Sequence, residues 1–349
     1  MDPYARGQAV GGCPLNSNQA LCIAPIVGTG NVFKIVDYSG GSNNVSVSLV
    51  FNDGDTSNYI DRFPNFHVLT VTGTVYTIAS TGLSQGGAFP YARVWDVDIS
   101  GSGSATPRGI IYPMGTSGSG NGKTTLVPLG TVGGKECFAL FYAKSTSSSG
   151  VAYYAVYEYN TSTNTLVETV GDTLYKSGAN LFSGQVRYKI DNGVGIIIFE
   201  DNKIVNVAGV KYDGSTFLVG VSSTFGSSSL PSRFPSVRPY YNGEENSTSQ
   251  FIIGSAVNQA VSGQKARYNL FPASYNSASN LFTTSDFDGS DSDNVLQDST
   301  VTGTTFSGSK NNCFIGQKDH EFGFMFGDFR DGAGTFRGSK GNSFQTSFN

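Results

Sequence analysis

The chain has 349 residues, a formal net charge of −4, and charged side chains at only 14% of its positions. A charge balance this close to neutral excludes attraction to nucleic acid or to an anionic membrane by bulk electrostatics. Aromatic residues make up 13% of the chain and Gly occurs 45 times, which excludes a disordered low-complexity chain and favours many short strands joined by tight turns.

The chain begins MDPYARGQAVGG, with no apolar run after a basic start, and no stretch reaches the roughly 20 apolar residues of a membrane span. We therefore expect the protein to be made in the cytosol without a signal peptide, and to stay there or join an assembly that is later released. Residues 1–19 lack hydrophobic periodicity, which predicts an irregular arm that docks on a partner or supplies a closing strand. Cys13 and Cys22 are close enough to pair if oxidised, although four cysteines in so long a chain make no disulfide framework.

An aromatic residue followed by a polar turn recurs along the chain, most clearly between Val151 and Leu166. The recurring positions are separated by 57, 64, 53, 63 and 54 residues, and they are Tyr38, Trp95, Tyr159, Tyr212, Tyr275 and Phe329. A repeat of about 58 residues that consists of strands and turns has the size of one propeller blade. The sequence therefore predicts an all-β fold: a single six-bladed β-propeller of mostly four-stranded antiparallel blades, closed by the termini. The expected blades span about residues 20–60, 61–115, 124–178, 184–226, 233–290 and 298–349.

The tripeptide Arg-Phe-Pro occurs twice, at 62–64 and at 233–235, and each copy opens an expected inner strand. The copies are 171 residues apart, which is three repeats of 57, so a six-fold ring would place them on opposite sides. Basic and aromatic residues near the inner strands would face the central channel and are the expected binding residues: Arg62, Arg233, Arg238, Tyr240 and Tyr241.

Two acidic turns are candidates for a structural calcium ion, the only cofactor that the sequence suggests. Asp286, Asp288, Asp291 and Asp293 surround a glycine, and alternating carboxylates with a tight turn can converge on a hard cation. The spacing differs from that of an EF-hand loop, so a solvated acidic loop is the alternative. The turn Asn52-Asp53-Gly54-Asp55 is a weaker candidate of the same kind.

Signals for catalysis are weak throughout the chain. Only two histidines are present, His67 and His320, which excludes a metal site with several imidazoles and leaves no recognisable nucleophile with its base. Residues 117–124, SGSGNGKT, come close to a phosphate-binding loop, but a strand pattern follows where such a loop needs a helix. Residues 212–217, YDGSTF, resemble the Asp-box of sialidases but lack a residue between Asp and Gly, so we expect Asp213 and Asn160 to cap their own turns.

The turns that begin with Tyr-Asn or Tyr-Asp and end in Leu or Phe resemble β-propeller repeats of the kelch-like kind, without the double glycine of true kelch blades. The Gly/Ser/Thr/Asn-rich, weakly charged character of the whole chain is similar to that of structural proteins of tailed-phage virions, such as tail, fibre or capsid-associated proteins. That resemblance implies a non-enzymatic component that binds neighbouring subunits through residues 1–19 and the blade loops, or attaches to a host surface. The alternatives are a carbohydrate-binding lectin-like propeller, and a glycan hydrolase or lyase that uses carboxylates in the channel.

Overall fold

The computed structural model shows a protein built from strands. It describes residues 11–26, 30–37, 39, 46–55, 60–84, 89–114, 124–144, 151–177, 185–186, 189–201, 204–225, 232–241, 246–257, 267–283, 295–297, 313–318, 321–328 and 335–340. These residues contain no helix that is long and apolar enough to cross a membrane.

The first three sheets each contain four antiparallel strands in chain order. The first sheet consists of β1 (Gly11–Pro14), β2 (Gln19–Ile26), β3 (Gly30–Asp37) and β4 (Ser46–Asn52). The second consists of β5 (Ile60–Thr72), β6 (Val75–Ser84), β7 (Pro90–Asp98) and β8 (Ser104–Ile111). The third consists of β9 (Thr124–Val132), β10 (Lys135–Ala143), β11 (Val151–Asn160) and β12 (Thr165–Ser177).

The remaining sheets are less regular. The fourth sheet pairs β14 (Val194–Asp201) with β15 (Ile204–Tyr212), and both β16 (Phe217–Val219) and β17 (Ser223–Phe225) pair with β15. The fifth contains β13 (Gln185–Val186), β18 (Ser232–Tyr241), β19 (Asn246–Val257), β20 (Arg267–Asn276), β21 (Leu281–Thr283) and β22 (Val295–Gln297). The last contains β23 (Cys313–Lys318), β24 (Glu321–Asp328) and β25 (Thr335–Lys340).

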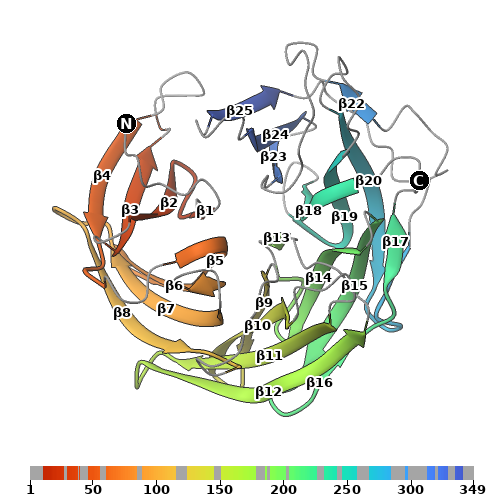
Figure 1. The fold of residues 1–349 in the computed structure, drawn as a ribbon, viewed down its shortest axis with the longest axis horizontal. Coiled ribbons are helices and arrows are strands. Elements are labelled where there is room, and N and C mark those ends of the chain that lie inside the picture. The colour runs from red at the N-terminus through yellow and green to blue at the C-terminus, as the bar shows by residue number, and fades with distance from the viewer. Residues whose placement is uncertain are drawn as a thin grey trace.

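The sheets follow one another around a common centre, with β5, β9 and β18 toward the inside and β4, β8 and β12 toward the outside (Figure 1). This arrangement is a β-propeller, so the predicted all-β fold with several four-stranded antiparallel sheets is confirmed.

Apolar cores fill the spaces between neighbouring sheets, and they explain the unbroken apolar run at residues 196–199 of β14. Ile197 and Phe199 pack in one core with residues of the third sheet, whereas Ile196 and Ile198 pack in another core with residues of the fifth. Successive side chains of a strand point to opposite faces, so a strand covered on both faces needs apolar residues at every position.

Three details differ from the expectations. Gly11–Pro14, expected in an irregular arm, form β1 on β2, while residues 1–10 lie outside the described part of the chain. The fourth expected blade, 184–226, does not keep its first strand, because β13 pairs in parallel with β18 of the fifth sheet. Among the described strands, the first sheet takes none from the C-terminal part, so closure by strands shared between the termini is not seen there.

The two Arg-Phe-Pro tripeptides mark the same irregularity in two sheets. The pairing of β5 with β6 shifts its register between Arg62 and Asn65, and that of β18 with β19 shifts between Arg233 and Ser236. Pro has no N–H to donate to a ladder, so a bulge is where a strand tolerates it. Both strands are the inner members of long sheets, as the sequence predicted.

Candidate functional site

Four of the recurring aromatic residues lie in the described part of the chain, and each approaches the preceding sheet; Tyr38 and Phe329 lie outside that part. Trp95 on β7 donates its indole N–H to Asp53 of the first sheet at 3.3 Å, and Tyr212 on β15 donates to Glu158 of the third at 2.9 Å. Tyr275 on β20 lies against Gly209 of the fourth sheet, where a Cβ atom would lie 2.6 Å from its ring. For Tyr159, burial together with the charge of Asp96 in the second sheet raises the pKa of the phenol. At these four positions the repeat detected in the sequence therefore corresponds to a contact between neighbouring sheets.

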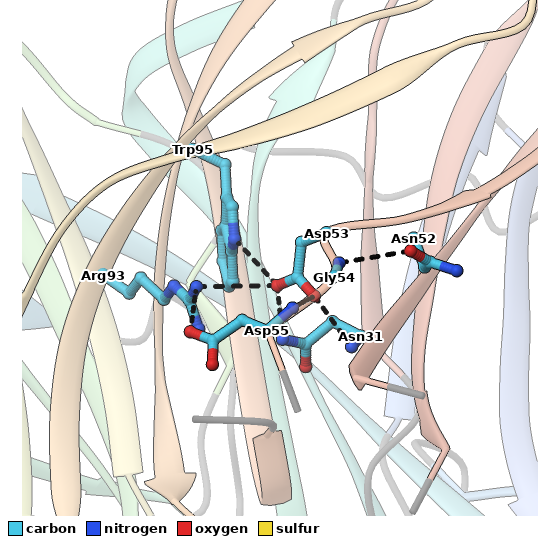
Figure 2. Close-up of polar contacts among 7 residues, drawn as sticks. All are labelled: Asn31, Asn52, Asp53, Gly54, Asp55, Arg93 and Trp95. Carbon is cyan, nitrogen blue, oxygen red and sulfur yellow. Dashed lines mark hydrogen bonds and ion pairs between the residues drawn. The ribbon is translucent and has the colours of Figure 1, made fainter. Parts of the chain in front are cut away.

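Asp53 is the centre of a polar cluster between the first and second sheets (Figure 2). Its Oδ1 accepts from the backbone N–H groups of Asn31 and Asp55, each at 3.1 Å, and its Oδ2 accepts from Asn31 Nδ2 at 2.7 Å. The turn is held locally as well, because Asn52 Oδ1 accepts from the N–H of Gly54 at 3.1 Å. The side chain of Asp53 has no exposed surface, so these donors replace the water that a carboxylate would otherwise bind.

Arg93 on β7 supplies the positive charge of this cluster. Its Nη2 lies 2.9 Å from Asp55 Oδ2 and 3.5 Å from Asp53 Oδ2, and its guanidinium carbon lies 4.7 Å from the centre of the Trp95 ring. The Arg93 side chain is 1% exposed, whereas that of Asp55 is 23% exposed. A charge this deeply buried is tolerated only when it is paired and hydrogen-bonded. The two carboxylates and one guanidinium leave the cluster with one net negative charge.

A second cluster of this kind joins the third and fourth sheets. Glu158 on β11 is 6% exposed; it accepts from Tyr212 Oη through Oε1 and from Lys135 Nζ through Oε2, at 2.5 Å. Burial raises the pKa of Tyr212 to about 12, and the hydrogen bond with Glu158 acts in the same direction. Lys176 and Asp201 form another ion pair across this junction, at 2.8 Å. We call the Asp53 and Glu158 clusters the two carboxylate clamps.

The geometry of the clamps favours structural work over proton transfer or metal binding. Every oxygen of Asp53 and Glu158 already accepts a hydrogen bond from a neighbouring side chain or backbone group. In the Asn52–Asp55 turn the guanidinium group of Arg93 lies between the two carboxylates. It occupies the position that a calcium ion at this turn would need. Within the described ranges, no group of three or more His, Cys, Asp and Glu side chains is arranged to hold a metal ion.

Sequence reasoning singled out Trp95, Tyr212 and the Asn52–Asp55 turn, but not the charged clamp residues Arg93, Lys135 and Glu158. A usable signal was present, because Arg93 stands within the apolar and aromatic run 90–95 of β7 and Glu158 within the run 151–159 of β11. A charge inside such a strand must find a partner, but the sequence does not say which one.

The predicted binding residues lie on two strands of different sheets, Arg62 on β5 and the others on β18. The side chains of Arg62, Arg233, Arg238, Tyr240 and Tyr241 lie outside the described part, so their role in binding stays a prediction. The same holds for the calcium site at Asp286, Asp288, Asp291 and Asp293, which falls within the undescribed residues 284–294.

The turn residues behave as predicted. Asn160 Oδ1 accepts from the N–H groups of Ser162 and Thr163, and Asp213 Oδ1 accepts from those of Ser215 and Thr216. These are side-chain caps of the local turn, and they account for the partial likeness to an Asp-box without a catalytic role.

The remaining candidates also have structural explanations. A strand, β9, begins at Thr124 where a phosphate-binding loop would need a helix. The β1–β2 register places Cys13 opposite Leu21 and Cys22 opposite Gly12, so the two thiols point to opposite faces and do not suit a disulfide. Burial raises the pKa of the Cys137 thiol to about 12, which makes it unreactive.

Comparisons with known proteins find no matching family model and no matching curated protein. Among solved structures, the chain is similar to a proposed 6-phosphogluconolactonase from Bacteroides fragilis, with a TM-score of 0.48 and 10% identity over 97% of this chain and 85% of that one. It is also similar to a GH43 endo-arabinanase from Bacillus licheniformis, with a TM-score of 0.41 and 12% identity over 81% and 96%. The β-propeller domain of Nup133 from Vanderwaltozyma polyspora gives a TM-score of 0.39 and 10% identity over 70% and 67%. Similarities of this size assign no activity to the chain, and the assignment of the fold rests on the sheets themselves.

Proposed function

We propose that the chain is a six-bladed, non-enzymatic propeller that acts as an assembly or attachment component. The observation that carries this proposal is the apolar surface on the outermost strands. Val47 and Val50 on β4 are 55% and 59% exposed, and Val167 and Leu174 on β12 are 47% and 55% exposed. Both strands end their sheets, so each also has one edge that is not paired within its sheet. An exposed strand edge with apolar side chains is a ready surface for another protein.

The two carboxylate clamps support the same proposal, because their role is structural. The buried carboxylates Asp53 and Glu158 hold neighbouring sheets together, which suits a rigid platform better than a catalytic centre. The count of six blades is supported by the repeat spacing and by the bulged Arg-Phe-Pro copies three repeats apart. A virion as the particular assembly is supported by the sequence character alone.

The test is light scattering coupled to size exclusion over a range of protein concentrations. The full chain is compared with a chain that lacks residues 1–10, because β1 begins at Gly11 and belongs to the first sheet. A double variant, Val47→Lys with Val50→Lys, probes the outer edge, and Thr163→Lys in an exposed turn is the matched control. We expect the full chain and the control to form a defined oligomer that the edge variant loses. Folded monomers for all four proteins at every concentration would overturn the self-assembly that this proposal requires.

A further inference from the structure

The outermost strand of the first sheet, β4, differs in composition from the other outermost strands that the structure describes (Figure 1). Its sequence is SVSLVFN, with no charged side chain and no proline. By contrast, β8 contains a proline and an arginine, β12 contains three charged residues, and β25 contains two basic residues. The strands at the outer edges of the fourth and fifth sheets, β16, β17, β21 and β22, have three residues each. Charge, proline and short length protect a sheet edge from pairing with another chain, so β4 is the least protected of these edges.

The pairing of β4 with β3 brings Val47 and Val50 to the same face of the sheet. Val50 lies opposite Lys34 and Val47 lies opposite Val36, because the register shifts by one residue at Ser48. The Ser48 hydroxyl donates to a backbone carbonyl of β3 at 3.3 Å, which holds this bulge in the sheet. Both valines are more than half exposed. The edge of β4 therefore carries two apolar side chains side by side on one face.

The backbone of β4 also has groups that point away from β3. Residues of antiparallel strands alternate between those whose N–H and C=O groups point to the neighbouring strand and those whose groups point away from it. The N–H of Asp53 donates to the carbonyl of Asn31 in β3 at 3.2 Å, and the register is regular from Leu49 to Asn52. The alternation therefore turns the N–H and C=O of Val50 away from β3. Among the described strands, β4 pairs with β3 alone.

This edge suits a second copy of the same strand. In a two-fold contact the same surface of both copies meets itself, so a charged strand would face its own charge. β4 has no charge to repel its copy, and antiparallel self-pairing can set Val47 opposite Val50 twice, on one face. The charged side chain nearest to these valines on that face belongs to Lys34 on β3. Three strand spacings, about 14 Å, would separate it from its counterpart, a distance at which salt screens most of the repulsion.

We propose that two copies of the chain pair antiparallel through β4, with Val47 of one copy opposite Val50 of the other, so that the two first sheets form one continuous sheet. This inference rests on the proposed function: it names a second copy as the partner of the outer edge, and β4 rather than β12 as the strand that binds it. A contact of one strand from each copy is small for a specific interface, so we expect a dimer that dissociates in the micromolar range.

The first test measures the mass of the full-length protein by light scattering as its concentration is raised. We expect wild type to pass from one chain of 36.9 kDa to two. Val50→Pro removes an N–H that points away from β3, a place where a strand tolerates proline, and this variant should stay monomeric. Val167→Lys with Leu174→Lys removes the exposed apolar side chains of β12. It is the matched control and should dimerise as wild type does.

Amide hydrogen exchange of wild type identifies the pairing strand directly, and it keeps the test decisive if Val50→Pro fails to fold. Exchange in Ser46–Asn52 should slow severalfold at the concentration that gives dimers, because it then requires the dimer to open, while exchange in Thr165–Ser177 should not change. Dimers that persist in folded Val50→Pro, or that protect β12 in place of β4, would overturn pairing through β4 and leave the proposed assembly role standing. A wild-type chain that stays monomeric up to about 1 mM would overturn that role together with this inference.

Discussion

Tyr212 of the fourth sheet donates a 2.9 Å hydrogen bond to Glu158 of the third, and Trp95 of the second sheet donates to Asp53 of the first in the corresponding way. Each aromatic residue belongs to the sequence repeat, and each acceptor is a buried carboxylate with its own cation. At these two positions the sequence repeat marks a hydrogen bond that joins one sheet to the sheet before it.

Replacing Tyr212 by Phe should destabilise the protein by about 1–2 kcal/mol, because the buried Glu158 loses one of its two donors. Urea unfolding followed by circular dichroism measures the change in the free energy of unfolding. Tyr154→Phe is the control, since no hydrogen bond of its hydroxyl is seen among the described residues. Equal stabilities of the two variants would contradict a clamp at Glu158.

Replacing Arg93 by Met should cost about 3–5 kcal/mol, because it leaves the Asp53 carboxylate buried without its counter-charge. Adding Asp53→Asn to Arg93→Met should recover part of that loss, as expected for residues that act as a pair. The double-mutant cycle is measured by denaturant unfolding. If the free-energy changes of the two single variants simply add up in the double variant, the ion pair between Arg93 and Asp53 at 3.5 Å contributes no coupling energy.

Acid should destabilise the protein in part through His67 on β5. Burial, together with the charge of Lys189, lowers the pKa of His67 to about 4 from an ordinary value of 6.5. The unfolded chain therefore binds more protons than the folded one below pH 6.5, so this contribution is fully present above pH 6.5 and declines as the pH falls toward 4. The loss is on the order of 3 kcal/mol at its limit.

The measurement is the melting temperature of wild type and His67→Gln between pH 4 and 8. The difference between the two proteins isolates His67 from the carboxylates that titrate in the same range. We expect the curve of the variant to be flatter between pH 6.5 and 4. Parallel curves would show that His67 titrates normally in the folded protein.

Asn280 ends the β20–β21 turn with a φ of 55°, accepts from Tyr275 Oη at 2.8 Å and donates to the carbonyl of Gly209 at 3.1 Å. Asn280→Ala should cost about 2–3 kcal/mol, since it loses both hydrogen bonds and replaces Asn by a residue that tolerates the left-handed region less well. Asn280→Gly keeps the backbone conformation and should cost less. Thermal unfolding of both variants shows which of them is more stable. An alanine variant at least as stable as the glycine variant would contradict the prediction.

Calcium should raise the melting temperature if the turn at 286–293 holds the ion as predicted. Millimolar calcium stabilises a protein that binds it only in the folded state, and Asp288→Asn with Asp291→Asn should abolish the shift. Magnesium serves as the control ion, because its smaller octahedral shell suits such a turn poorly. No shift with calcium would leave the turn as a solvated acidic loop.

Sequence by itself determined the features that depend on near neighbours in the chain. Alternating and continuous apolar runs located most strands, because the period of a strand and the burial of its faces are local properties. The Asx caps at Asn160 and Asp213 follow equally from local hydrogen bonding.

Only the tertiary structure decided which distant groups meet. Arg93 and Asp53 are 40 residues apart and Tyr212 and Glu158 are 54 apart, and many acidic residues would have satisfied the same local rules. The structure also moved β13 from the fourth sheet to a parallel pairing with β18, and drew residues 11–14 out of an expected arm into β1. The short strands β1 and β13 have weak local preferences, so the unpaired backbone groups of β2 and β18 decide where they lie. The buried charges are placed by the partners that a neighbouring sheet offers.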